Sequence, residues 1–251
     1  MQAEVIQQLL DINYQFYQTF GGAFAATRRR VQPGIRKVLE QIPENGHWLD
    51  LGCGSGALAQ LWVKQGRQGG FHGLDFSAVL LQEARELLAG KEIDAGLEIR
   101  FVEADLLSSE WPASLPRKHY DGILCFAAMH HIPAYEKSLQ LVRQVRGLLM
   151  EGGLFIHSNW QFQHSPRLMA RVQSWTQIGL QVEHLEEGDT LLDWRYALPG
   201  QSEKVGYRYV HRFSENEFER LAHEGGFEIK DRFESDGEGG RLGLYQIWQA
   251  I

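Results

Sequence analysis

A glycine-rich turn between a short apolar strand and an apolar helix constrains this chain more than any other feature. The turn, residues 50–56, reads DLGCGSG, follows the mainly apolar residues 47–49 and precedes the apolar run 57–63. Glycines let a ligand approach the backbone closely, and the free N–H groups at the start of a helix then point at that ligand. Asp50 adds an acceptor that a phosphate would avoid. The turn therefore predicts a site for a cationic amino-acid cofactor rather than for a pyrophosphate.

Strand and helix patterns alternate along the chain around and after this turn. Strands are expected over residues 48–51, 71–75, 97–102, 120–126 and 153–158, and helices over residues 57–65, 78–89 and 134–150. Such alternation is typical of a parallel sheet with helices on both of its faces.

The C-terminal part departs from this alternation. Ser214 and Glu217 have the spacing of a capping box, which predicts a helix that a pair of glycines ends. Residues 227–233 and 242–249 are expected to be strands, and the turn between them is so short that they must pair antiparallel. We therefore expect an α/β protein with a Rossmann-like, doubly wound, mostly parallel seven-stranded sheet that is closed by an antiparallel C-terminal hairpin.

The regions outside the alternating core complete the predicted organisation. Apolar residues at helical spacing predict a helix from Gln2 to Phe20 that ends at two glycines, and a second helix from about Pro33. Residues 160–212 interrupt the sheet pattern and are rich in aromatic residues, so we expect them to face the substrate and to hold a helix over 166–178; a functionless surface embellishment is the alternative. The single domain is expected to have four segments: an N-terminal helical lid (1–45), a cofactor-binding core (46–159), a substrate-facing insertion (160–212) and a C-terminal helix and hairpin (213–251).

Composition excludes several classes of protein. The chain has 251 residues, 43% of them apolar, and a formal net charge of −7, so it is globular and has no overall basic character for nucleic-acid binding. Its two cysteines, Cys53 and Cys125, are too few for a disulfide scaffold, and the histidines lack the spacing of a metal site. Residues 1–5 have neither the basic start nor the apolar segment of an export signal, and no apolar run reaches the roughly 18–20 residues that span a membrane. We expect a cytoplasmic protein with no metal and no membrane partner.

Carboxylates recur where the predicted strands end. Asp75 ends the second strand about twenty residues after the glycine turn, where it can accept both hydroxyls of a ribose. Ser77 is placed to cap the next helix. Asp105 follows the third strand, where its side chain can accept the exocyclic amine of an adenine while the neighbouring backbone contacts a ring nitrogen. Each of these features is common by itself, but their order at successive strand ends is specific.

Taken together, the region from about Gly46 to Met150 and the closing hairpin resemble the class I S-adenosylmethionine-dependent methyltransferases. The resemblance implies that the chain is an enzyme whose cofactor is S-adenosylmethionine and whose product is S-adenosylhomocysteine. It places the methionine moiety at the glycine turn, the ribose at Asp75, the adenine at Asp105 and the sulfonium over Cys125. The cofactor-binding residues that it implies are Tyr17, Arg28, Asp50, Gly52, Cys53, Gly54, Asp75, Phe76, Asp105, Leu106, Cys125 and Phe126.

Motifs outside the core resemble more closely the wobble-uridine tRNA methyltransferases related to the methyltransferase domain of AlkB homologue 8. These motifs are Tyr17 with FAATR (24–28), AMHHI (128–132), GDTLLDW (188–194) and RYVHRF (208–213). That family methylates the carboxylate of a carboxymethyluridine, so the resemblance implies a tRNA acceptor and a small activating protein partner. The family has a proline where this chain has an aspartate before the tryptophan, and the net charge is negative. A small metabolite methylated on oxygen, nitrogen or carbon is the alternative acceptor.

The chemistry of methyl transfer suggests roles for the remaining polar residues. Because the methyl group is already activated, the protein mainly holds the two reactants in line. A carboxylate acceptor would be held by an arginine, such as Arg28, Arg195 or Arg208, whereas a hydroxyl or amine needs a base such as a histidine. A structural role is the alternative for each candidate. The catalytic candidates are Arg208, His130, His211 and Arg195, with His131 as a further possible base.

Two other functions fit parts of the sequence. The glycine turn also fits the permissive G-x-G-x-x-A pattern of nicotinamide-dependent oxidoreductases, and Asp75 stands at the expected ribose position. Asp50, Asp105 and the terminal hairpin argue against that function. A chain that binds the cofactor or a partner without turnover is the other alternative.

Overall fold

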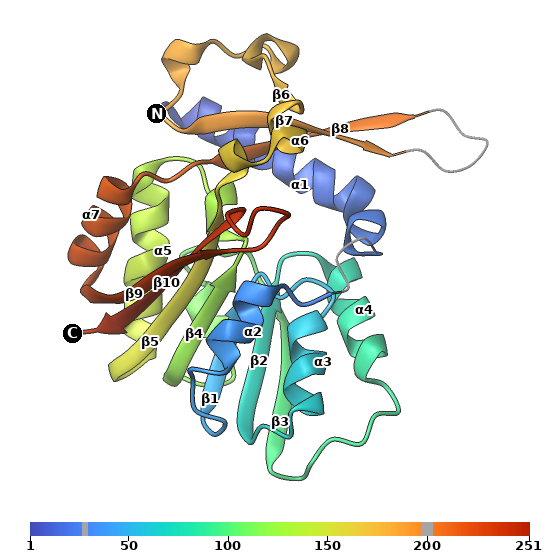
Figure 1. Cartoon of the computed structure of the whole chain (residues 1–251), viewed down its shortest axis with the longest axis vertical. Coiled ribbons are helices and arrows are strands. Elements are labelled where there is room, and N and C mark those ends of the chain that lie inside the picture. Colours follow the sequence, from blue (N-terminus) through green and yellow to red (C-terminus); the bar gives the residue numbers. More distant parts are fainter. Residues whose placement is uncertain (27–29, 197–202) are drawn as a thin grey trace.

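The computed structural model describes residues 1–26, 30–196 and 203–251, and its largest element is a seven-stranded sheet (Figure 1). The strand order is β3-β2-β1-β4-β5-β10-β9. The first five strands run parallel, and β10 lies antiparallel to both β5 and β9. This arrangement confirms the predicted fold class and the closing hairpin. The strands are β1 (His47–Leu51), β2 (Gly69–Asp75), β3 (Leu97–Glu103), β4 (Tyr120–Phe126), β5 (Leu149–Trp160), β9 (Phe227–Ser235) and β10 (Gly243–Ala250).

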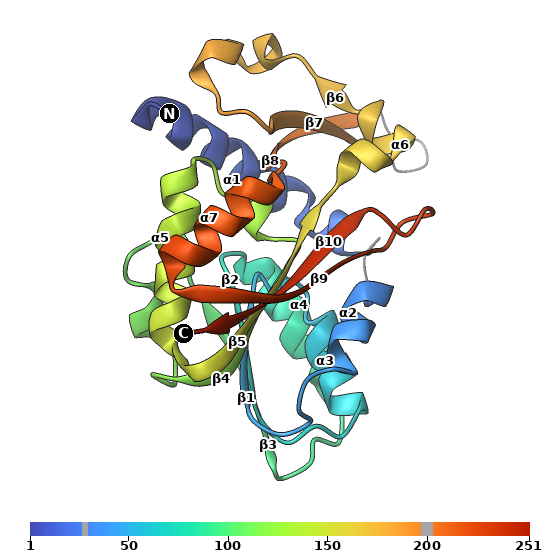
Figure 2. The same ribbon diagram turned by 60° about the vertical axis from the view of Figure 1, so that its left-hand side comes forward.

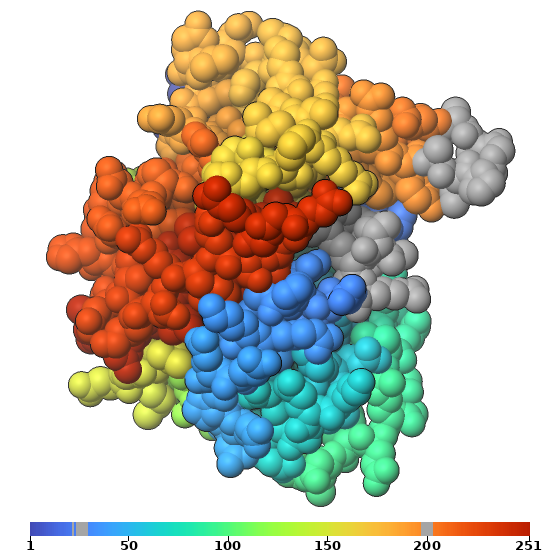
Figure 3. All heavy atoms as spheres, viewed as in Figure 1, coloured from blue at the N-terminus to red at the C-terminus, as the bar shows by residue number. Residues whose placement is uncertain are grey.

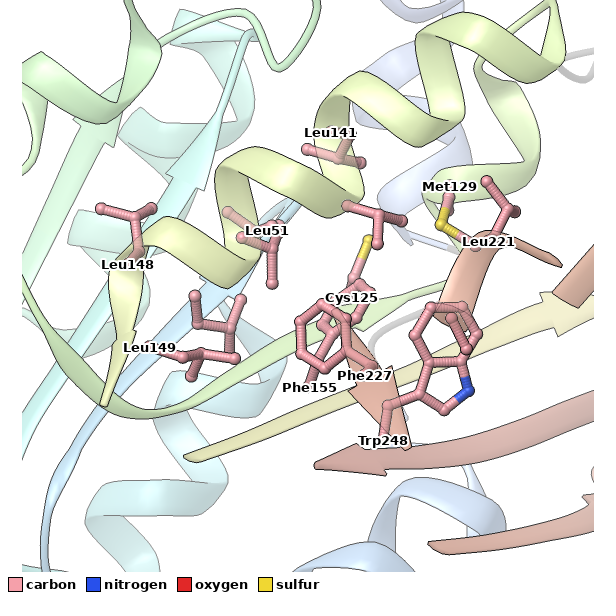
Figure 4. Close-up of a cluster of buried hydrophobic side chains, with 14 of the residues drawn as sticks. Leu51, Cys125, Met129, Leu141, Leu148, Leu149, Phe155, Leu221, Phe227 and Trp248 are labelled. Atoms are coloured by element: carbon pink, nitrogen blue, oxygen red, sulfur yellow. The ribbon is translucent and has the colours of Figure 1, made fainter. Parts of the chain in front are cut away.

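Helices cover both faces of this sheet because each buries one apolar stripe against it. One face carries α2 (Pro33–Leu39), α3 (Ala57–Lys64) and α4 (Ala78–Leu88), whose leucines pack around Trp48 and Phe71. The other face carries α5 (Tyr135–Leu148) and α7 (Glu215–Gly225). Figure 4 shows this second core, in which α5 lies over Leu51 and Phe155 of the sheet and Trp248 of β10 closes one end.

The predicted capping box of α7 is present. The Ser214 hydroxyl accepts the backbone N–H of Glu217, and the Glu217 carboxylate accepts the backbone N–H of Ser214 at 2.7 Å. Gly226, with a φ of 82°, ends the helix in the left-handed region that glycine adopts without a steric cost. The sequence is sufficient to predict this helix because its start and its end are both encoded by neighbouring residues.

A close contact between Gly122 of β4 and the ring of Trp48 predicts a large effect of a small substitution. A Cβ atom at position 122 would overlap the Trp48 ring, which is fully buried and has little room to move. We expect Gly122→Ala to lower the free energy of unfolding by about 2 kcal/mol, measured by urea denaturation. Gly147→Ala in α5 is the control: no described atom lies within 4 Å of its added Cβ, so it should be neutral or stabilise the protein by about 0.5–1 kcal/mol. Equal losses in the two variants would contradict the packing argument.

The N-terminal helix is longer than the sequence predicts. α1 (Ala3–Ala26) continues through the glycines that were expected to end it. Figures 1 and 2 show it lying between the carboxyl ends of the parallel strands of the main sheet and a second, smaller sheet. Phe20 packs edge-on against Trp194 of that small sheet, with 5.3 Å between the ring centroids. This packing favours the continued helix over the local preference of glycine for a helix end.

The insertion forms a sheet that the sequence analysis did not predict. β6 (Val172–Gln173), β7 (Asp189–Tyr196) and β8 (Lys204–His211) pair antiparallel in the order β6-β7-β8. The single helix expected over 166–178 is wrong: the segment holds α6 (Pro166–Met169), then β6, then a 3₁₀ turn. β6 pairs with β7 so that Val172 lies opposite Leu192, and this pairing outweighs the helix-like spacing of apolar residues in the segment. In the space-filling view the insertion, yellow to orange, forms one end of the molecule and borders the red hairpin turn (Figure 3).

Within the part of the chain that the structure describes, no helix combines the length and the apolar character needed to cross a lipid bilayer.

Candidate active site

A cavity of about 780 Å³ lies at the carboxyl ends of β1 to β4 and beneath α1. The strand order reverses between β1 and β4, and open α/β sheets bind ligands at such a reversal. One face of α1 covers the cavity with Ile6, Leu10, Asn13 and Tyr17, which follow the spacing of a single helical stripe. The glycine turn, residues 50–56, forms the opposite wall.

The glycine turn has the backbone geometry that its sequence predicts. Gly52, Gly54 and Gly56 have φ values of 73°, 53° and 77°, in the left-handed region that glycine adopts most readily. A Cβ atom at Gly52 would lie 2.8 Å from the Cβ of Ala128, whereas no described atom lies within 4 Å of a Cβ built at Gly54. The turn is therefore packed tightly on one side and open toward the cavity on the other.

Two buried carboxyl groups lie beside the turn. Asp75 accepts the backbone N–H groups of Gly54 and Ser77, each at 2.9 Å, so it ties the turn to the start of α4. Burial raises the pKa of Asp75, and the backbone hydrogen bonds partly offset that rise. Burial, with a further contribution from the charge of Asp75, raises the pKa of Asp50 to about 8. The pair is suited to a ligand that brings a positive charge and hydroxyl donors.

A more open part of the cavity lies past the end of β3. Asp105 is exposed, lines the cavity and accepts the backbone N–H of Leu107 at 2.9 Å. Phe76 lies under α1, with its ring centroid 5.8 Å from that of Tyr14 and 5.9 Å from that of Tyr17. A flat ring system could lie in this part of the cavity between aromatic and aliphatic side chains.

The structure brings most of the predicted cofactor residues together. The members that line the cavity are Tyr17, Asp50, Gly52, Cys53, Gly54, Asp75, Phe76, Asp105, Leu106 and Phe126. The Cys125 side chain does not line it, because the alternation of β4 turns that side chain into the apolar core under α5 (Figure 4). Arg28 lies outside the described residues.

The predicted catalytic residues are placed less favourably. Arg208 is only 2% exposed and lies beneath Tyr17, with its guanidinium 4.8 Å from the Phe16 ring centroid and 5.2 Å from that of Trp160. Arg195 is exposed and pairs with Asp193 at 3.0 Å. His130 is fully buried, with Nδ1 3.4 Å from the backbone N–H of Trp160. None of Arg208, Arg195, His130 and His211 is among the described residues that line the cavity.

His211 has a structural role, which the sequence analysis gave as the alternative to a catalytic one. Its Nδ1 lies 2.7 Å from Asp189 and its Nε2 lies 3.0 Å from Glu217, so it joins β7 to α7. Burial alone would lower the pKa of His211, but the hydrogen bonds to the two carboxylates outweigh it and raise the pKa to about 9. A histidine that is protonated near neutral pH cannot act as a base, so His211 is a structural ion pair.

This ion pair predicts a pH dependence of stability. Because the folded-state pKa of His211 is raised from 6.5 to about 9, its contribution is complete below pH 6.5 and is lost as the pH rises through 9. We expect the urea midpoint to fall between pH 7 and 9, and His211→Gln to remove the larger part of that fall. The remainder comes from Asp50, whose raised pKa of about 8 also costs stability as that group ionises. His184→Gln, at an exposed histidine of the insertion, should keep the whole fall. A fall of the same size in His211→Gln would assign the pH dependence to other groups.

Two residues that matter for the site are His131, which the sequence offered as a further possible base, and Asn13, which the sequence analysis did not identify. His131 lines the cavity at the end of a 3₁₀ turn (Met129–His131). Asn13 is 7% exposed; its amide group contacts the backbone of His131 and of Tyr209, which fastens α1 to both. A lone asparagine beside the apolar stripe of a helix is the signal that could have identified Asn13. The described residues hold no group of three histidine, cysteine or acidic side chains that could bind a metal ion.

Comparisons with known proteins agree with this geometry. Residues 49–155 match a family model described as a methyltransferase domain. A ubiquinone biosynthesis O-methyltransferase from Yersinia pestis (strain Pestoides F) is 30% identical over 124 residues, which are 49% of this chain and 46% of that protein. The chain spans about half the length of curated relatives that it matches.

Solved structures share this fold over most of the chain. An S-adenosylmethionine-dependent methyltransferase from Clostridium acetobutylicum superposes with a TM-score of 0.63 at 16% identity, covering 93% of this chain and 98% of that one. The amino pentose methyltransferase CalS10 from Micromonospora echinaspora, solved with S-adenosylmethionine bound, superposes with a TM-score of 0.60 at 18% identity over 91% of this chain and 96% of that one. The chain therefore has the fold of the class I S-adenosylmethionine-dependent methyltransferases, and its residues 49–155 match the methyltransferase-domain model.

Proposed function

We propose that this protein transfers the methyl group of S-adenosylmethionine to a small-molecule acceptor with an apolar body. One observation carries the proposal: a single cavity connects the glycine turn and its buried carboxyl groups to the apolar inner face of α1. A class I methyltransferase needs both parts in one space, because the cofactor and the acceptor must meet in line.

The residues at one end of the cavity fit this cofactor. Asp50 is buried and its pKa is raised, so the α-ammonium group of S-adenosylmethionine would supply the positive charge that its carboxylate needs. Asp75 retains lone pairs on both oxygens for the ribose hydroxyls, and Asp105 with Leu106 would hold the adenine. The open side of Gly54 leaves room for the methionine backbone. When bound, the cofactor supplies an activated methyl group.

The residues at the other end favour a small apolar acceptor. Ile6, Leu10 and Ile132 line this end, and α1 covers it. Lys137 of α5 supplies a cation at its edge. A mainly apolar cavity wall can exclude water from a metabolite ring or chain that packs against it, which is how most small-molecule sites obtain their affinity.

A modified wobble uridine is the second candidate, supported by the resemblance of the sequence motifs. Its carboxylate would need a cation at the methyl group, as in a bidentate arginine pair. The position of Arg208 beneath Tyr17 and the pairing of Arg195 with Asp193 both weaken this candidate. Lys137 and Arg30, which both line the cavity, are then the cations that would hold the carboxylate.

Calorimetric titration with S-adenosylhomocysteine tests the proposed function. We expect micromolar binding, no binding of the reduced nicotinamide dinucleotide, and methyl transfer from labelled S-adenosylmethionine to a small apolar acceptor rather than to undermodified tRNA. Absence of binding by the wild-type protein would refute the proposed cofactor. Methylation of tRNA alone would establish the second candidate in place of the first.

A further inference from the structure

We propose that Tyr17 and His131 form a proton relay beside the cofactor and that the methyl acceptor is therefore a hydroxyl group. This inference rests on the proposed function and names the acceptor chemistry of the same site. Both side chains line the cavity, and both lie near the end of β4, next to the glycine turn and the apolar acceptor end.

The two ring nitrogens of His131 have different partners, and these partners determine its tautomer. Nδ1 lies 2.9 Å from the backbone oxygen of Tyr209, which can only accept, so Nδ1 must carry a proton. In the neutral ring Nε2 is then unprotonated, and it lies 3.0 Å from the Tyr17 hydroxyl, which must donate to it. His131 Nε2 is therefore a basic nitrogen, and the Tyr17 hydroxyl connects it to the cavity by a hydrogen bond.

Neighbouring groups hold this arrangement in place. Asn13, one helical turn before Tyr17, accepts the backbone N–H of Tyr209 at 2.8 Å, and its amide nitrogen lies 3.2 Å from the backbone oxygens of both His131 and Tyr209. These bonds join α1, the 3₁₀ turn and β8. Arg208 hydrogen-bonds to Tyr17, and its positive charge stabilises negative charge that develops on the tyrosine oxygen. Tyr17 is thereby oriented from both sides.

The proton balance follows from these contacts. The acceptor oxygen forms a bond to the methyl carbon while the bond from carbon to sulfur breaks, and that electron pair stays on the sulfur. The hydroxyl proton moves to Tyr17 Oη as the Tyr17 proton moves to His131 Nε2. The imidazolium that results keeps its bond to the Tyr209 carbonyl and later loses its proton to solvent. A carboxylate acceptor has no proton to lose and would not use the relay.

Neither His130 nor His211 combines access to the cavity with a ring nitrogen that can take a proton. His130, the preceding residue, is fully buried and does not line the cavity. His211 is held as an imidazolium by two carboxylates. His131 combines access to the cavity with a nitrogen available to take a proton. Tyr17 is assigned as the catalytic residue, and His131, which acts through Tyr17, is assigned as a positioning residue.

Three acceptor probes with the same apolar body test the assignment: p-hexylphenol, p-hexylbenzoate and p-hexylaniline. We expect methylation of the phenol, with Tyr17→Phe and His131→Gln each lowering kcat about 100-fold. In His131→Gln the Kd for S-adenosylhomocysteine should change less than about twofold. The loss of kcat in Tyr17→Phe should become smaller as the assay pH approaches the phenol's own pKa near 10, because solvent has then already removed the phenol's proton. Tyr207→Phe is the control, because that hydroxyl lies on β8 and contacts Gln177.

A spectroscopic measurement keeps the test independent of turnover. In ¹⁵N-histidine spectra, the signal that His131→Gln removes should show an unprotonated Nε2 and should shift in Tyr17→Phe. A protonated Nε2, or a signal that Tyr17→Phe leaves unchanged, overturns the relay even if none of the probes is methylated. Methylation of the benzoate but not the phenol also overturns it. If the wild-type protein does not bind S-adenosylhomocysteine, the proposed function fails, and this inference fails with it.

Discussion

Replacing Asp75 by alanine is expected to weaken binding of S-adenosylhomocysteine about 100-fold or more. On the proposed function, each oxygen of this carboxylate accepts a ribose hydroxyl while also accepting a backbone N–H, from Gly54 and from Ser77. Hydrogen bonds to a charged group contribute about 1.5–3 kcal/mol each, and every 1.4 kcal/mol is a factor of about ten in affinity. Calorimetric titration of the variant and the wild type measures the difference.

A structural role of Asp75 must be separated from its role in binding, because the same carboxylate ties the glycine turn to α4. Asp75→Asn keeps the shape and one acceptor oxygen, so it should bind more tightly than Asp75→Ala but more weakly than the wild type. Thermal unfolding of each variant shows whether the fold is retained. Asp231→Ala, at an exposed aspartate of β9, should bind as the wild type does. Wild-type affinity in a folded Asp75→Ala variant would show that the ribose does not contact this residue.

The affinity for S-adenosylhomocysteine is expected to rise about tenfold per pH unit from pH 6 to about 8. Burial and the charge of Asp75 raise the pKa of Asp50 to about 8, so without ligand Asp50 is mostly protonated below that pH. The ammonium group of the ligand favours the carboxylate, and binding therefore releases one proton. Lowering the pH opposes that release and weakens binding, by about 100-fold over two pH units.

Titrations in buffers of different ionisation enthalpy count the proton directly. Asp50→Asn cannot release it, so its affinity should be lower at pH 8 and should depend far less on pH. The ligand's own titration is common to both proteins and cancels in the comparison. A pH profile of the wild type that is flat between 6 and 8, or that matches the profile of Asp50→Asn, would mean that Asp50 does not titrate on binding.

Much of the core could be predicted from the sequence because its signals are local. The strand before the glycine turn, the turn itself and the helix after it are encoded by consecutive residues 47–64, and the observed φ values of the glycines agree. The capping box at Ser214 and the short C-terminal turn likewise determine α7 and the closing hairpin within a few residues. The predicted carboxylates Asp50, Asp75 and Asp105 meet in one cavity because parallel strands end at the same edge.

The insertion could not be predicted in the same way. β6 pairs with β7 across about twenty residues, and β7 pairs with β8 across a connection of which residues 197–202 lie outside the described part of the chain. Short strands such as Val172–Gln173 carry no periodic pattern of their own, and their pairing depends on a neighbour that the local sequence does not specify. The local sequence of residues 166–178 therefore favoured the prediction of a helix.

The fold class, the glycine turn and the cofactor end of the cavity could be placed from the sequence alone, because neighbouring residues and the shared edge of parallel strands are sufficient to specify them. Only the tertiary structure distinguished His131 from His130, two adjacent residues of the same type. Their difference arises from the carbonyl of Tyr209 and the hydroxyl of Tyr17, which lie 78 and 114 residues away in the chain. The roles of such side chains depend on contacts between distant segments, which the chain acquires only when α1 and β8 pack together over the end of β4.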